Sequence, residues 1–360
     1  MTTRRDFMRG ASAGVIFCSC GLLDHARAQA PAARQRVTIK GRTIKTIDVH
    51  AHCAFRDVIP LLGKDANVLT PPVRGNEEVF VDIAQRLEGM DSQGVDMEVL
   101  SVNPFWYGRE RDQGAEIVRI NNEKMAELCA SHPDRFAGFA SLTLQAPDLA
   151  VQELETAVKK QGLKGAAIGD RVNGVEFSDP RFHPVWAKAE ELGVPLFIHP
   201  QGQPELNKRL EGNGWLSNTI ANPLGTTIAL SHLIFEGTLD RHPGLKVIAA
   251  HGGGYLPSYA DRSDHACLVG PKGCNPEIKL KKQPSEYLKQ IYFDSLIFSP
   301  EAIRHLVAQV GASQVVLGSD YPYPWEMNPV APILATASLS DDERADILGR
   351  TAAKLFNVQA

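Results

Sequence analysis

The sequence lacks a long apolar run, a low-complexity tract and a strong excess of either charge. No apolar run reaches the roughly 20 residues that a transmembrane helix needs, so we expect no membrane anchoring. The net charge is −4 over 360 residues, which gives no indication of a nucleic-acid or anionic-membrane partner. With 43% hydrophobic and 22% charged residues, the chain favours one large α/β domain over two small ones.

Cysteine is scarce as well, with six residues in the whole chain. Two of the six fall in an N-terminal segment that we expect to lie outside the fold. Cys53 follows a histidine-rich strand end and could lie near a metal, although histidines already supply enough ligands. Cys267 and Cys274 share an expected loop and could form a disulfide in an oxidising compartment. Connectivity cannot be read from sequence, so this pairing stays open.

The N-terminal segment has the features of an export signal. Residues 3–9, Thr-Arg-Arg-Asp-Phe-Met-Arg, resemble the twin-arginine signal, and a mildly apolar stretch with small-residue cleavage sites follows. We expect cleavage after Ala28, because cleavage after Ala30 would leave a proline beside the scissile bond. The protein is therefore expected to be periplasmic or otherwise exported, with three parts: a signal peptide (1–28), a linker (29–43) and a barrel domain (44–360).

Eight short apolar segments with strand character recur along the remaining chain, and a helical pattern follows every segment but the sixth. Alternating strands and helices imply a parallel sheet, and eight repeats predict a closed (β/α)8 TIM barrel. Two connections, 54–77 and 201–222, are unusually long, so we expect them to roof a pocket. The expected strands are 46–49, 97–102, 136–142, 165–168, 196–199, 247–250, 291–294 and 315–317.

Several of these strands end in metal-ligand residue types. His50 and His52 alternate on one strand, so both imidazoles face the same side. His199, His251 and Asp320 end three other strands, and the C-terminal ends of barrel strands form the rim where active sites lie. Three imidazoles and one carboxylate suit one divalent transition metal, most of all Zn2+, with Mn2+, Co2+ or Fe2+ possible. His251 could act as a general base or acid on a water at that metal without being a ligand.

The end of the fourth strand bears on how many metal ions are bound. Barrels of this architecture that hold two ions bridge them with a modified lysine at this position. Here residues 166–169 read Ala-Ala-Ile-Gly, and Lys164 lies at the opposite end of the strand. The sequence therefore predicts a single metal ion.

The ordered set of motifs resembles a known family. The His-x-His strand, the lone His199, His-Gly-Gly-Gly at 251–254 and Gly-Ser-Asp-Tyr-Pro at 318–322 are similar to those of the amidohydrolase-related metal-dependent decarboxylases, above all the aminocarboxymuconate semialdehyde decarboxylase branch. The resemblance covers nearly the whole expected barrel domain. It implies that His251 activates a metal-bound water, and that the metal ligands are His50, His52, His199 and Asp320.

The resemblance also implies residues that bind the substrate. Arg74 matches a substrate-carboxylate arginine by its distance from Met90, and Arg262 matches a second arginine that the neighbouring subunit supplies. Bidentate arginine–carboxylate pairing suits a decarboxylase, and the shared site implies a homodimer or a larger oligomer. Loop aromatics, with Phe105 and Trp215 among them, are candidates to stack on a planar substrate.

Two catalytic functions are consistent with these residues. The first is a metal-dependent decarboxylase (carbon–carbon lyase) that acts on an aromatic or unsaturated carboxylic acid. The alternative is a metal-dependent hydrolase of a lactone, amide or ester that uses the same water as nucleophile. Arg74 and Arg262 favour the decarboxylase. A third possibility, a barrel that only binds a carboxylate, is opposed by the intact ligand set and by His251.

Overall fold

The computed structural model describes residues 34–270, 274 and 277–359, and Arg34 onward forms one unit. The expected signal peptide and the first part of the expected linker lie outside the described residues. The described part of that linker contains a short antiparallel hairpin, β1 (Thr38–Ile39) and β2 (Arg42–Thr43). No helix in the described part of the chain has the length and apolar character needed to cross a membrane.

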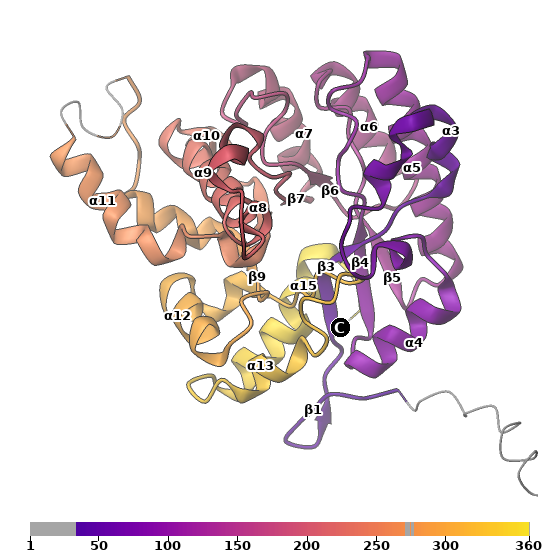
Figure 1. Ribbon diagram of the computed structural model, residues 1–360. Coiled ribbons are helices and arrows are strands. Elements are labelled where there is room, and N and C mark those ends of the chain that lie inside the picture. The colour runs from indigo at the N-terminus through magenta and orange to yellow at the C-terminus, as the bar shows by residue number, and fades with distance from the viewer. Residues whose placement is uncertain (1–33, 271–273, 275–276, 360) are drawn as a thin grey trace, which may run out of the picture. The chain divides into compact units, whose positions relative to one another are not determined.

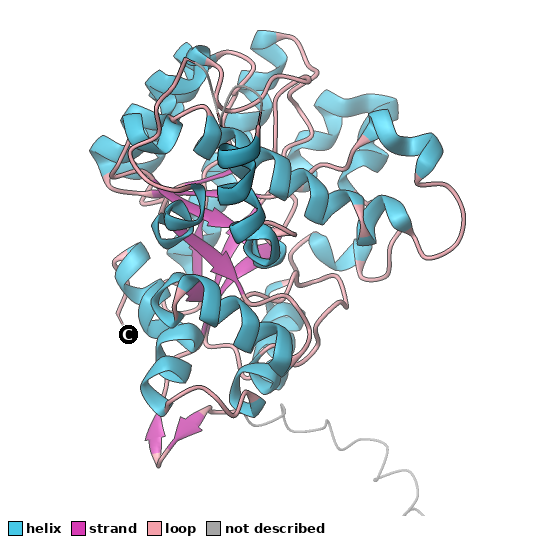
Figure 2. Cartoon of the chain, turned by 90° about the vertical axis from the view of Figure 1, so that its left-hand side faces the viewer, coloured by secondary structure: helices cyan, strands magenta, loops and turns pink. Residues whose placement is uncertain are grey.

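The centre of this unit is a set of eight parallel strands surrounded by helices (Figures 1 and 2). Neighbouring strands pair in chain order, first β3 to β5 and then β6 to β10. Their residues are almost entirely buried, which explains why each strand reads as a short apolar run. The strands are β3 (Ile47–His52), β4 (Met97–Ser101), β5 (Phe136–Gly138), β6 (Ala166–Ile168), β7 (Pro195–Ile198), β8 (Lys246–Ala249), β9 (Ile291–Asp294) and β10 (Val315–Val316).

Parallel bridges join the two groups of strands at both seams. After β5, Ala140 bridges Ala166 of β6, and the Ala140 amide donates to the Gly165 carbonyl at 2.8 Å. Ala51 of β3 bridges Tyr321, which follows β10. These contacts link the eight strands in sequence order, and the predicted (β/α)8 TIM barrel is confirmed.

Local sequence features explain where a helix such as α12 begins and which face it buries. Ser299 caps α12, because its hydroxyl accepts a hydrogen bond from the Ala302 amide at 3.2 Å, and Pro300 occupies the first turn. The buried side of α12 presents Ile303, Leu306 and Val310 at helical spacing. The longer helices are α4 (Ile83–Gln93), α5 (Arg111–Ser131), α6 (Pro147–Lys159), α7 (His183–Leu192), α9 (Ala221–Phe235), α11 (Ala260–Val269) and α12 (Pro300–Val310). The shorter ones are α3 (Ile59–Leu62), α8 (Leu216–Thr219), α10 (Thr238–Arg241), α13 (Val330–Ala335), α14 (Asp341–Ala345) and α15 (Thr351–Phe356).

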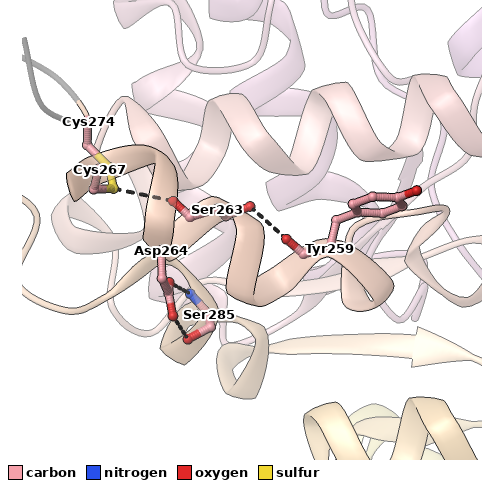
Figure 3. Close-up of a disulfide and its surroundings, with 6 residues drawn as sticks. All are labelled: Tyr259, Ser263, Asp264, Cys267, Cys274 and Ser285. Atoms are coloured by element: carbon pink, nitrogen blue, oxygen red, sulfur yellow. Dashed lines mark hydrogen bonds between the residues drawn. A yellow bond between two sulfur atoms is a disulfide. The ribbon is translucent and has the colours of Figure 1, made fainter. Parts of the chain in front are cut away.

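Helix α11 follows the sixth strand, where the sequence analysis expected no helix and placed Cys267 and Cys274 in a loop. Cys267 lies in this helix and forms a disulfide with Cys274 in the following segment, so the two cysteines do not share one loop (Figure 3). Ala260 is the only buried residue within the described span of α11, which therefore carries no apolar periodicity for sequence analysis to detect. Asp264 anchors the helix by accepting hydrogen bonds from the amide and hydroxyl of Ser285, at 2.8 and 2.6 Å.

Candidate metal centre

The first two candidate ligands lie together at the end of β3. His50 and His52 are both buried, and their Nε2 atoms are 3.1 Å apart. Period-2 alternation places both side chains on the inner face, as predicted from the His-Ala-His sequence. The Nδ1 atom of His52 lies 3.0 Å from the Ser101 hydroxyl of the neighbouring strand, and this contact orients its ring.

The other two candidates meet them from distant strands. His199 directly follows β7, and Asp320 follows β10. Asp320 Oδ1 lies 2.9 Å from His52 Nε2 and 3.3 Å from His50 Nε2. One ligand atom from each of the four residues falls within 4.8 Å of all the others. The structure therefore brings together the four residues that the sequence analysis selected.

The chemistry of this cluster fits a divalent cation. Both ring nitrogens of His199 are buried and have no hydrogen-bond partner in the described part of the chain. Unpaired buried nitrogens are costly, and coordination to a metal satisfies one of them. Three imidazoles with one carboxylate form a donor set that divalent transition metals accept.

The charges around the cluster favour a positive species at its centre. Burial lowers the pKa of His50, but the carboxylates of Asp320 and Asp294 outweigh burial and raise the pKa to about 10. Burial, together with His52 and His50, holds the pKa of His199 well below its usual range. Burial raises the pKa of Asp320, yet His50 and His52 outweigh it and hold the pKa well below normal. The carboxylates of Asp320 and Asp294 therefore favour a positive species beside them, and a divalent cation can supply that charge in place of a proton.

Asp294 is a residue of this site that the sequence analysis missed. It ends β9, is fully buried, and its Oδ2 lies 2.6 Å from His50 Nδ1. The same oxygen accepts a hydrogen bond from the His251 amide at 2.9 Å, and Oδ1 accepts from the amides of Gly252 and Leu296 at 2.8 and 3.1 Å. Asp294 thus directs His50 Nε2 toward the other ligands and holds the turn that carries His251. Its position at a strand end was the available signal.

A second buried carboxylate supports the seam between β3 and β10. Asp48 Oδ1 accepts from the His50 amide at 2.9 Å, and Oδ2 accepts from the Ser319 hydroxyl. Burial and the neighbouring Glu98 raise the pKa of Asp48 to about 7. Because Ser319 directly precedes Asp320, this contact fixes the two ligand segments relative to each other.

His251 lies beside the cluster in a tight turn after β8. Its ring centroid is 5.3 Å from that of His50 and 5.4 Å from that of His199. His251 (φ 56°) and Asp320 (φ 67°) both adopt the left-handed backbone region, which non-glycine residues rarely occupy outside constrained sites. Gly254 is required in this turn, because a Cβ there would clash with the Pro223 carbonyl.

The His251 ring is available for proton transfer. Its Nδ1 atom is buried and has no hydrogen-bond partner among residues 34–270 and 277–359. Burial, followed by the effect of His50, lowers the pKa of His251 to about 4. The imidazole is therefore neutral near pH 7 and can accept a proton.

A cavity of about 540 Å³ opens beside His199 and Asp320. Residues of both long connections line it, which confirms that these connections cover the pocket. Phe105 and Trp215 line it as well, and their role in substrate binding stays a prediction. Trp215 stacks on Trp325 with ring centroids 5.4 Å apart and an interplanar angle of 15°.

The two arginines predicted from the sequence to bind substrate do not line this cavity. Arg74 is exposed and lines an adjacent cavity of about 450 Å³ with Trp215 and Trp325, not the cavity beside His199. Arg262 is exposed on α11 and lines neither of these two cavities. Their roles in substrate binding stay predictions.

A closed barrel with a buried three-histidine, one-aspartate cluster on its rim defines a metal-dependent barrel enzyme. Residues 47–358 match the amidohydrolase family model, and the chain belongs to this family. It is 30% identical over 323 residues to the 2-amino-3-carboxymuconate-6-semialdehyde decarboxylase of Dictyostelium discoideum, covering 87% of this chain and 85% of that protein.

Solved structures show the same relationship. The 5-carboxyvanillate decarboxylase of Sphingomonas paucimobilis superposes with a TM-score of 0.77 at 26% identity, covering 88% of this chain and all of the other. A dihydroxybenzoic acid decarboxylase from a Polaromonas species, with bound manganese and the inhibitor 2-nitroresorcinol, gives a TM-score of 0.74 at 25% identity. That match covers 87% of this chain and 97% of the other.

Proposed function

We propose that this protein is a metal-dependent decarboxylase that removes CO2 from an aromatic or unsaturated carboxylic acid. The observation that carries the proposal is the buried cluster of His50, His52, His199 and Asp320 with the unpartnered His251 beside it. The decarboxylases described above share the fold along nearly their whole length, which supports the same reaction class.

The cluster is proposed to hold one divalent metal ion through His50, His52, His199 and Asp320. Zn2+ is our first candidate, because imidazole-rich sites with one carboxylate suit it, and manganese in the Polaromonas relative makes Mn2+ the main competitor. A divalent ion there would act as a Lewis acid on substrate oxygens.

The chain's own residues would bind the substrate and move a proton. Phe105 and Trp215 would hold the planar part of the substrate against the cavity wall. Neutral His251 would take a proton from water and pass it to the carbon that carried the carboxylate. As the carbon–carbon bond breaks, its electron pair stays on that carbon and CO2 leaves. Carboxylate and water thus become the protonated product, CO2 and hydroxide.

Assembly and location are also part of the proposal. We infer that Arg74 and Arg262 bind the substrate carboxylate, with Arg262 supplied by a second copy of the chain in a homodimer. Exposure of Arg262 on α11, which extends away from the strands in Figure 1, supports a contact with another subunit. The disulfide between Cys267 and Cys274 supports export to an oxidising compartment such as the periplasm.

The test is a substrate screen with two separate readouts. Protein expressed with added zinc or manganese is incubated with carboxymuconates, hydroxybenzoates and lactones, while CO2 release and pH are followed independently. A decarboxylase releases CO2 and consumes protons, whereas lactone hydrolysis releases protons without CO2. Metal-depleted protein serves as the control, and lactone hydrolysis without any CO2 release would overturn the proposal.

A further inference from the structure

Helix α4 carries an arginine that is buried against the strands of the metal centre. Arg86 is only 2% exposed. Its Nε atom donates to Glu98 Oε2 of β4 at 2.6 Å, and its Nη1 atom donates to the backbone carbonyl of His52 at 2.9 Å. The guanidinium also lies over the ring of Tyr321, 4.9 Å from its centroid. One buried side chain thus contacts β3, β4 and the segment that follows β10.

Two of these contacts fall at metal-ligand segments. His52 is the last residue of β3, and Tyr321 directly follows Asp320. The His52 amide donates to the Tyr321 carbonyl at 2.7 Å, and His52 Nε2 lies 2.9 Å from Asp320 Oδ1. Arg86 therefore contacts both of the chain segments whose relative position sets the distance between these two ligand atoms.

The face of α4 that carries Arg86 is shaped to receive Tyr321. Gly89 lies one turn further along the helix, on the same face as Arg86. A Cβ atom at Gly89 would lie 2.7 Å from the Tyr321 hydroxyl, which is too close for a non-bonded contact. That hydroxyl lies 3.4 Å from Glu78 Oε2. Helix α4 and the segment before it therefore locate both the ring and the hydroxyl of Tyr321.

Buried carboxylates explain why a positive charge is stable behind the strands. Glu98 is opposite Asp48 in the pairing of β3 with β4, and both side chains are fully buried. Asp48 accepts a hydrogen bond from the Ser319 hydroxyl, whereas Glu98 pairs with Arg86. A buried charge is stable only with an opposite charge or hydrogen bonds beside it. Glu98 therefore holds the guanidinium in place, and Nη1 is left directed at His52.

We propose that Arg86 is a positioning residue of the metal centre. Its guanidinium fixes the end of β3 relative to the segment after Asp320, and so holds the ligand atoms of His52 and Asp320 at their separation. A lysine cannot replace it, because one ammonium group cannot serve a carboxylate, a carbonyl and an aromatic ring that lie in three directions. The inference rests on the proposed metal centre and is independent of the reaction that the metal supports.

The main test compares two arginine-to-lysine variants. Arg135 makes the same kinds of contact as Arg86, to a carboxylate (Asp91 Oδ1, 2.7 Å) and to a backbone carbonyl (Asp96, 2.9 Å), but it directly precedes β5, at the opposite end of the strands. Arg86→Lys should lower the affinity for Zn2+ and for Mn2+ about 10–100-fold, the usual effect of losing a group that orients a ligand. Arg135→Lys should keep the native affinity. Affinity is measured by competition with a chelator, and the melting temperature of the metal-free proteins is measured beside it.

A spectroscopic measurement separates positioning from a general loss of stability. Co2+ is bound to the native protein and to both lysine variants, and its visible absorption reports the arrangement of the ligands. The absorption bands should shift in Arg86→Lys and stay unchanged in Arg135→Lys, even if both variants melt at the same lower temperature. Native affinity and native bands in Arg86→Lys, with only a lower melting temperature, would overturn the inference. Because no readout depends on turnover, failure of the decarboxylase function would leave this result standing.

Two further variants decide the question if Arg86→Lys does not fold. Arg86→Met combined with Glu98→Leu replaces the buried ion pair by apolar side chains, a change that often leaves stability unaffected. This double variant should bind Zn2+ at least tenfold more weakly than the native protein. Gly89→Ala should also weaken binding by displacing Tyr321, and adding Tyr321→Phe should restore part of the affinity, because it removes the hydroxyl that the new Cβ meets. Native affinity in both the double variant and Gly89→Ala would refute the positioning role.

Discussion

Predicted site residues at the strand ends of the barrel and those in the segments that follow the strands differ in where the structure places them. His52, His199 and Asp320 stand at or just after strand ends, and their ligand atoms lie within 4.8 Å of one another although the residues are far apart in sequence. Arg74 lies in a long connection and Arg262 on helix α11, and neither lines the cavity beside His199. Closing a barrel brings all strand ends to one rim, whereas the position of a side chain in a connection depends on how that connection packs. Residues at strand ends are therefore the more dependable basis for assigning chemistry.

The largest expected effect comes from breaking the rim cluster. Asp320→Ala should lose most of the bound metal and reduce decarboxylation to background, because the variant removes the only carboxylate of the donor set. Elemental analysis of the native protein should find about one divalent ion per chain. The control is Asp342→Ala, an exposed aspartate that pairs with Arg350. Full metal occupancy in Asp320→Ala, or two tightly bound ions in the native protein, would contradict the assignment.

Removing His251 should affect the reaction without affecting the metal. A general acid–base group contributes roughly 10²–10⁴-fold, so His251→Ala should lose about that factor in kcat. Metal content and melting temperature are measured beside the rate, with His265→Ala on the exposed part of α11 as the control. Loss of metal in His251→Ala would make this residue a ligand rather than a proton carrier.

A variant of Asp294 tests whether a residue that orients a metal ligand affects metal binding as strongly as the ligands themselves. In Asp294→Asn, an amide NH2 group replaces one oxygen of a carboxylate that contacts His50 and three backbone amides. Each oxygen serves two of these donors, so two contacts turn from attraction to repulsion. Loss of a group that orients a ligand typically costs 10–100-fold in metal affinity or activity, and we expect a loss in that range. Ser101→Ala, which removes the neutral contact to His52, is the matched control and should lose less. Equal metal affinity in the two variants would show that Asp294 does not orient His50 for metal binding.

The smallest expected effect tests whether helix α11 of one chain completes the site of a second chain. Arg262→Ala should weaken substrate capture about tenfold, since a charged hydrogen bond contributes roughly 1.5–3 kcal/mol. The control is Arg304→Ala, whose guanidinium pairs with Glu301 on its own helix. Mixing Arg262→Ala with His251→Ala should restore partial activity, because one site of a mixed dimer has both native groups.

Two results would refute this shared site. One is full activity in a species that light scattering identifies as a monomer. The other is the absence of rescue on mixing after subunit exchange has been confirmed by an independent label. In either case Arg262 would have no part in a neighbouring site.

Some features escaped prediction for identifiable physical reasons. Helix α11 buries only Ala260 within its described span, so it lacks the apolar pattern by which an amphipathic helix is recognised. Asp294 ends its strand as Asp320 follows another, but a single aspartate in a sequence does not reveal that its oxygens serve His50 and the turn of His251. Hydrogen bonds between distant segments become visible only when the barrel is closed.

The sequence by itself determined the eight strands, their parallel order and the identity of the clustered residues His50, His52, His199 and Asp320. Strand alternation is a local property of the backbone, and barrel closure then leaves little freedom to residues at the strand ends. Only the tertiary structure decided how the space above the cluster is divided. Trp325 lines both the cavity beside His199 and a cavity beside His251, and it stacks on Trp215 from a connection more than a hundred residues earlier; such long-range packing has no periodic signal in the sequence.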